Sequence, residues 1–378
     1  MRKHYYAKFH NSSASSINKY LLRLFFCVIP ALAAGFIIFI VRRSSPYTVE
    51  RVYSSNIFVR ISALLGAVSR WSKYSITSVI YILLAAAAVV LIVSFLFFML
   101  TSPDKAVIAG LYLKIVVFIV SIIFFLFSVL CMPNYYRLTF AQNAGIELND
   151  YTVDDLESMC IHLIEQTNLE RNNISEPKGH SFYDTSEKAK AAFDALSSDY
   201  PFLGKAEAAA KPFLFSKLLT VLNLTGFYFP YTAEANVNTH MPETELPFTI
   251  CHELSHTRGF MRENEANYIG FIACMRSDDS FIRYSGLYCA LMHSMNSLYD
   301  EDSERYFKLR ELYSEPLSYD CAVLSDFWQP YFDTPAAELS NSVNDVYLKA
   351  NDLSDGIKSY GRMVDLLMAQ YLKNGTLV

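Results

Sequence analysis

Three long apolar runs lie within the first 132 residues, separated by short polar stretches. Residues 24–41 and 77–101 contain no charged side chain, and residues 106–132 contain one, Lys114. A helix needs about 20 apolar residues to cross the hydrocarbon of a bilayer. Runs of this length do not suit the core of a soluble protein, so we predict three transmembrane helices at these positions.

Between the first two runs, residues 54–74 alternate apolar side chains with Arg60, Arg70, Trp71 and Lys73. This mixture is typical of an amphipathic helix that lies in the membrane interface, with its tryptophan at the depth of the headgroups. A solvated connector between two spans is the alternative.

The pattern after residue 132 is that of a folded domain in water. Thr152 and the acidic residues that follow it indicate the capped start of a helix that runs to about residue 168. Residues 226–238 begin with aromatic residues and continue with alternating polar ones, which predicts an extended strand. Residues 211–224 are apolar enough either to be buried or to lie against the membrane.

The predicted architecture is a mainly α membrane protein, with a membrane domain at 1–132 and a mostly helical α+β domain with a small sheet at 133–378. The net charge of −5 is mild and gives no reason to expect nucleic acid as a partner. The lysine and arginine residues that flank the spans divide six against seven between the two sides. This balance leaves the side of the membrane that the second domain faces undecided.

The strongest chemical motif is His-Glu-x-x-His at residues 252–256. On a helix, His252 and His256 project from one face, one turn apart, and can bind one Zn²⁺ through neutral imidazoles. Glu253 lies about 100° around the helix, where it is placed to take a proton from water rather than to bind the metal. A chance occurrence of the motif on a solvated helix is the alternative.

A third zinc ligand is needed, and two carboxylates follow the motif. Glu263 and Glu265 are two residues apart, so on a second helix they point to nearly opposite faces and only one can reach the ion. We predict Glu263, with Glu265 as the alternative. Asn267 shares a face with Glu263 and is the candidate for a hydrogen bond that orients a histidine.

Substrate-binding and oxyanion-stabilising groups are less well defined by the sequence. Glu234, Asn236 and Asn238 alternate along the predicted strand, whose exposed backbone would pair with a peptide substrate; an ordinary strand is the alternative. Candidate donors to the oxyanion, all downstream of the motif, are Tyr360, Arg362 and His293. A structural role is the alternative for each of them.

Several segments together resemble a bacterial family of multi-pass membrane proteins that carries a zincin-type protease signature and has no assigned function. The resemblance rests on residues 226–238, 246–260 and 263–267, and extends to residues 347–351 and 359–363. More distantly, Glu-x-x-Ala-Asn at 263–267 is similar to the Glu-x-x-x-Asp element of gluzincin metallopeptidases, whose first Glu binds zinc. Here Asn267 replaces the aspartate. The resemblance implies a zincin-like peptidase fold in a bacterial cell membrane, but it supplies no substrate.

These observations predict a membrane-anchored zinc metalloendopeptidase with Glu253 as its general base. Arg258, Arg262 and Glu263 make the motif segment too polar to cross lipid, so we expect the active site to lie outside the hydrocarbon. Its substrates would then be peptides or proteins near the membrane surface. The alternatives are a non-catalytic sensory or signalling membrane protein that binds a ligand or partner, and a structural protein with adventitious motifs. Glu253 favours the enzyme, because a purely structural metal site needs no general base.

Overall fold

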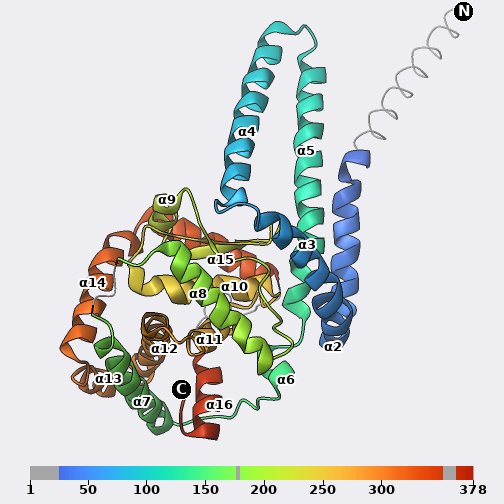
Figure 1. Ribbon diagram of the computed structural model, residues 1–378. Coiled ribbons are helices and arrows are strands. Elements are labelled where there is room, and N and C mark those ends of the chain that lie inside the picture. The colour runs from blue at the N-terminus through green and yellow to red at the C-terminus, as the bar shows by residue number, and fades with distance from the viewer. Residues whose placement is uncertain (1–24, 176–178, 352–362, 378) are drawn as a thin grey trace, which may run out of the picture. The chain divides into compact units, whose positions relative to one another are not determined.

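The computed structural model describes residues 25–175, 179–351 and 363–377 of the chain, and within them it is mainly helical with one small sheet (Figure 1). Contacts within the chain define two compact units. Unit 1 comprises Met1–Ser45 and Ile80–Pro133, and unit 2 comprises Pro46–Val79 and Asn134–Val378.

The part of unit 1 that the structure describes contains long apolar helices. The helix Phe25–Arg43, α4 (Ile76–Thr101) and α5 (Lys105–Leu130) coincide with the three predicted spans, and each is long and apolar enough to cross a membrane. A helix of 26 residues is about 39 Å long, which exceeds the hydrocarbon thickness of a bilayer. The rings of Phe95 and Tyr112 lie 5.1 Å apart and join α4 to α5 as a hairpin.

A fourth helical segment, Pro46–Ser69, is also long and apolar enough to cross a membrane. It is continuous through α2 (Pro46–Thr48), the π-helix η1 (Val49–Phe58) and α3 (Val59–Ser69). We predicted an interfacial helix over 54–74, grouped with the membrane domain. The helix in the structure starts and ends earlier, and its contacts group it with unit 2. One of these contacts is a hydrogen bond of 2.9 Å from Ser62 to the carbonyl of Thr257.

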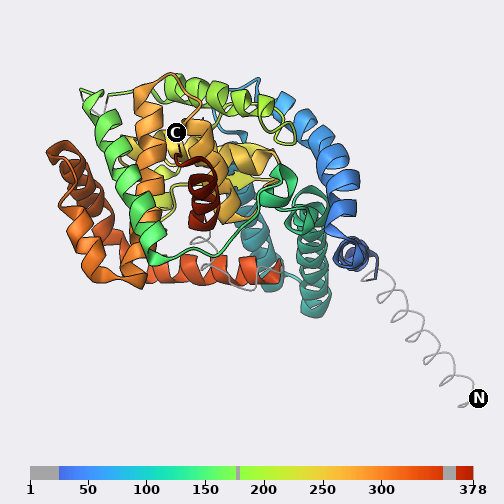
Figure 2. The same cartoon turned by 90° about the horizontal axis from the view of Figure 1, so that it is seen from below.

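Helices form most of unit 2, and the largest of them surround one apolar core (Figures 1 and 2). The helix predicted from Thr152 is confirmed as α7, and a reciprocal hydrogen-bonded pair between Thr152 and Asp155 caps its first turn. The α-helices of unit 2 that follow α3 are α6 (Phe140–Ala144), α7 (Val153–Asn172), α8 (Phe182–Ala195), α9 (Ser216–Val221), α10 (Leu246–Thr257), α11 (Glu263–Cys274), α12 (Ser280–Glu301), α13 (Ser303–Arg310), α14 (Glu315–Phe332), α15 (Pro335–Ala350) and α16 (Met363–Asn374). Short 3₁₀ turns cover Met132–Tyr136, Leu196–Ser198 and Glu243–Glu245.

The sheet has three short strands in the order β1-β3-β2, where β1 is Lys211–Pro212, β2 is Gly226–Phe229 and β3 is Glu234–Val237. β1 runs parallel to β3, and β2 runs antiparallel to it with Tyr228 opposite Ala235. β3 is therefore the central strand, and all of its residues are buried. The prediction of an exposed, substrate-pairing strand at Glu234, Asn236 and Asn238 is thus wrong.

The polar side chains of β3 instead hold the beginning of α4. The Glu234 carboxylate accepts hydrogen bonds from the backbone N–H groups of Ile76 and Thr77, at 3.0 and 2.7 Å, and pairs with the Lys211 ammonium at 2.8 Å. Burial would raise the pKa of Glu234, but the hydrogen bonds from Lys211 and Thr77 lower it below its ordinary value. A negative charge at the first turn also suits the helix dipole. Asn236 adds a hydrogen bond with Ser75, so β3 serves as an anchor for this helix.

Candidate metal centre

Two helices and the tight turn between them form the site. α10 carries the two histidines, and α11 begins with Glu263 after a turn at Gly259. Gly259 has φ +84, a conformation that glycine adopts without strain. Gly270 lets α11 approach α10 closely, because an added Cβ there would lie 3.2 Å from the backbone nitrogen of His252. The short turn and close packing bring Glu263 to the histidine face of α10.

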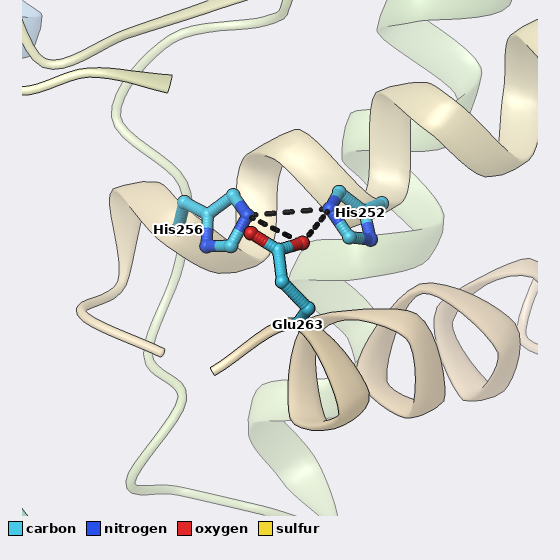
Figure 3. Close-up of side chains that lie close together, drawn as sticks. All are labelled: His252, His256 and Glu263. Carbon is cyan, nitrogen blue, oxygen red and sulfur yellow. Dashed lines mark hydrogen bonds and ion pairs between the residues drawn. The ribbon is translucent and has the colours of Figure 1, made fainter. Parts of the chain in front are cut away.

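His252, His256 and Glu263 converge on one point (Figure 3). Glu263 Oε2 lies 3.2 Å from His252 Nε2 and 3.8 Å from His256 Nε2, and the two ring nitrogens are 3.2 Å apart. A tetrahedral zinc ion with ligands at 2.0–2.2 Å separates its ligand atoms by about 3.3–3.6 Å. The three distances are close to this range, and the donor types suit zinc, so these three side chains could hold a metal ion.

Glu265, the alternative ligand, lies on the other side of α11. Its carboxylate accepts a hydrogen bond of 3.0 Å from the backbone of Phe140 and pairs with Arg262 at 3.3 Å. These interactions hold α6 and the turn before α11 in place. Glu263 is thus the carboxylate that faces the imidazoles, as we predicted.

A backbone carbonyl orients His256. Its Nδ1 lies 2.7 Å from the carbonyl oxygen of Phe260, and since a carbonyl only accepts hydrogen bonds, Nδ1 carries the proton. The lone pair of Nε2 then faces the centre of the cluster when the ring is neutral. Asn267 is buried on α11, but within the described residues no hydrogen bond joins it to either imidazole. The orienting role that we predicted for Asn267 is therefore filled at His256 by Phe260.

Glu253 is buried beside the cluster, with 3% of its surface exposed. In the part of the chain that the structure describes, its Oε2 atom has no hydrogen-bond partner. Burial raises the pKa of Glu253 to about 7, against the opposing influence of His252 and His256. A carboxyl group with a pKa near neutrality can both accept and return a proton, which is the property that a general base requires.

The Glu263 carboxylate forms ion pairs with the two histidines. Burial alone would lower the pKa of His256, but the neighbouring Glu263 carboxylate raises it to about 9. Burial works in the opposite direction on Glu263, whose pKa is nevertheless held well below its usual value by the charge of His256 and the hydrogen bond from His252. Near neutral pH, the proton that a metal would displace therefore sits on His256.

Of the three oxyanion candidates, only His293 lies within the described residues; Tyr360 and Arg362 lie outside them. His293 is on α12, where burial and the neighbouring His252 lower its pKa to about 4. Sequence reasoning missed Tyr228 of β2, whose ring centroid is 6.4 Å from that of His256. Tyr228 belongs to the aromatic residues at the beginning of the segment 226–238, whereas we predicted substrate binding by the polar residues at its end.

Gly226 of β2 gives a direct test of how tightly Glu253 is packed. A Cβ added at Gly226 would lie 2.7 Å from Glu253 Oε1 and 3.0 Å from the carbonyl oxygen of Asn236. We expect Gly226→Ala to lower the free energy of unfolding by about 1–3 kcal/mol, because the carbonyl oxygen of Asn236 is part of the sheet backbone and cannot move away from the added methyl group. Thermal unfolding in detergent measures this change. Gly35→Ala is the control, since its added methyl group meets no atom within 4 Å and should change little; equal stability of the two variants would contradict the packing.

A buried ion pair between Arg137 and Glu50 supports the turn between α10 and α11. The Arg137 guanidinium binds both oxygens of Glu50, at 2.7 and 2.8 Å, and donates a hydrogen bond of 3.0 Å to the carbonyl of Arg258. It also stacks on the ring of Phe260, 3.9 Å from the ring centroid. Arg137 thereby links the π-helix η1 to the residues that orient His256.

The comparisons with known proteins define a family but no activity. A family model described as "Protein of unknown function (DUF3810)" matches residues 53–368. No curated protein and no solved structure matches the chain.

Proposed function

The chain belongs to the DUF3810 family, and we propose that it is a membrane-anchored zinc metalloendopeptidase. The observation that carries the proposal is the convergence of His252, His256 and Glu263 beside a buried Glu253 whose Oε2 has no partner among the described residues. Three ligands with an open fourth position are typical of catalytic zinc sites, whereas structural sites use four protein ligands.

The residues fit a zinc ion by donor type and by spacing. His252 and His256 would hold it through Nε2 and Glu263 through its carboxylate, and the ion would supply Lewis acidity and activate water. Glu253 would accept the proton of the attacking water at its free Oε2 and pass it to the leaving nitrogen. Among the described residues, His293, which is neutral at pH 7, and Tyr228 are candidates to donate a hydrogen bond to the developing oxyanion. Tyr360 and Arg362 stay candidates from the sequence alone.

We infer that the substrates are peptides or protein segments close to the membrane surface. Arg258 and Glu263 make the motif segment polar, and the same chain has helices long and apolar enough to cross a membrane. A tethered site meets juxtamembrane segments at a high effective concentration.

Metal content and cleavage, measured on the same preparation, test the proposal. The full-length chain is purified in detergent, its zinc is quantified, and it is incubated with a peptide library. We expect one zinc per chain, cleavage of internal peptide bonds, loss of cleavage with a chelator and recovery when zinc is added back. A chain that binds no zinc would eliminate the peptidase and leave the motif as adventitious.

The pH dependence of zinc binding gives an independent check. Because His256 has a pKa of about 9 without metal, zinc must displace a proton from it at neutral pH. We therefore expect the zinc association constant to rise by up to about tenfold per pH unit from neutral pH and to level off near the pKa of His256. Titration with a competing zinc indicator at several pH values measures this slope. A flat profile below pH 8 would contradict the ion pair between His256 and Glu263.

A further inference from the structure

α9 buries the polar side chains of Ser216 and Thr220 together with Leu219, and it exposes apolar side chains on its outer face. Leu214, Phe215, Leu218 and Val221, which we call the α9 surface, are exposed by 66, 38, 55 and 42%. Leu218 and Val221 follow the spacing i, i+3 and share one face of the helix, and Leu214 and Phe215 lie in the turn before it. A surface helix in water usually turns its apolar side chains to the core, so exposed apolar side chains opposite the buried Ser216 and Thr220 are unusual.

The buried side of α9 is satisfied by polar contacts. Thr220 Oγ1 donates a hydrogen bond of 2.7 Å to the carbonyl of His240, and Ser216 Oγ accepts one of 3.0 Å from the backbone of Thr239. Both side chains are buried. The orientation of α9 is therefore fixed by these hydrogen bonds, and its apolar face is held outward by the fold of unit 2.

The α9 surface adjoins the start of a membrane-spanning helix. The backbone N–H of Leu214 donates a hydrogen bond of 3.1 Å to Ser78 Oγ, in the first turn of α4. Lys211, three residues earlier, binds the carbonyls of Ser69 and Tyr74 at 2.5 and 3.4 Å. These contacts all lie within unit 2, and they bring the residues before α9 to the point where the chain passes into its most apolar helix.

The turn before α4 has the composition of a membrane interface. Trp71 and Tyr74 are 93% and 75% exposed, and Lys73 and Lys217 are exposed beside the apolar residues. Tryptophan and tyrosine concentrate at the headgroup level of bilayers, and lysine there pairs with lipid phosphates.

We propose that the α9 surface is immersed in the interfacial layer of the lipid bilayer, together with Trp71 and Tyr74. Unit 2 then rests on the membrane through α9 in addition to its covalent connection to α4. β2 begins a few residues after α9, so this contact also fixes the height of the strand beside His256 above the membrane. The proposal concerns lipid contact alone and stands whether or not the chain binds zinc.

Depth-dependent fluorescence quenching tests the contact in the full chain. Trp71→Phe leaves the buried Trp328 as a constant background, and Leu218→Trp is added to it. Phe307→Trp in the same background is the control: this residue is 62% exposed on α13, at the other end of unit 2 from α9 (Figure 1). Each variant is reconstituted in phosphatidylcholine vesicles with ordinary or brominated acyl chains, and iodide serves as the aqueous quencher.

We expect brominated lipid to quench most of the added emission of Leu218→Trp and little of that of Phe307→Trp, with the reverse order for iodide. Quenching of Leu218→Trp by iodide and not by lipid would place α9 in water and overturn the proposal. Protection from both quenchers would overturn it as well, because a protein surface, such as a second copy of this chain, would then cover α9. Equal quenching of Leu218→Trp and Phe307→Trp by brominated lipid would also overturn the proposal, because the lipid contact would then not be specific to the α9 surface.

Discussion

Glu253→Gln should lower the rate of peptide cleavage by about 10²–10⁴-fold while the zinc content stays at the wild-type level. Glutamine keeps the size of the side chain but cannot accept a proton. Glu253 is not one of the three converging ligand groups, so its loss removes no metal contact. The Oε2 atom of Glu253 has no hydrogen-bond partner among the described residues, so the substitution breaks no hydrogen bond at that atom.

Glu263→Gln is the matched variant for this measurement, because it removes a carboxylate charge from the same cluster at a position that faces both histidines. It should lose zinc and cleavage together, whereas Glu253→Gln should lose cleavage alone. Unchanged cleavage in Glu253→Gln would refute the general base. If the wild-type chain bound zinc but cleaved nothing, the non-catalytic sensory or signalling protein would become the better hypothesis.

Arg137→Met should lower the free energy of unfolding by about 3–5 kcal/mol. The Arg137 side chain is 2% exposed and that of Glu50 is 9% exposed, so removal of the guanidinium leaves an uncompensated carboxylate in the protein interior. The carbonyl of Arg258 loses a hydrogen bond at the same time. Thermal or denaturant unfolding in detergent measures the loss.

The double variant Glu50→Met with Arg137→Met separates the buried charge from the lost packing. With both charges gone, most of the stability should return, since apolar replacement of a whole buried pair is often neutral or better. A single variant as stable as the wild type would contradict the buried pair. A double variant no more stable than the single one would assign the loss to the contact with Phe260 instead.

The apolar spans and the histidine pair could be predicted because each depends on residues close together in the chain. The length and apolar composition of a run such as Ile76–Thr101 predict a helix that could cross a membrane, and His252 and His256 share a face wherever the segment is helical. Glu263 and Glu265 could likewise be treated as alternatives, because two residues that are two positions apart on a helix point to nearly opposite faces. Which of them faces α10 depends on the turn at Gly259 and on Arg262 and Phe140, which hold Glu265 away from the site.

Packing between distant segments determines the position of β3 in the sheet and the face of α9 that points outward, neither of which could be predicted from the sequence. An alternating segment such as Glu234–Val237 looks alike at the edge and in the centre of a sheet, because β1 and the start of α4, which cover it, come from distant parts of the chain. Likewise, the apolar residues of 211–224 suited either a core or a membrane until the buried polar contacts of Thr220 fixed which face of α9 points outward. The sequence by itself determined which helices are long and apolar enough to cross a membrane, and which residues are candidate metal ligands. Only the tertiary structure decided which carboxylate faces the histidines, which strand lies beside them and which apolar surface is left exposed, because those choices depend on contacts between segments far apart in the chain.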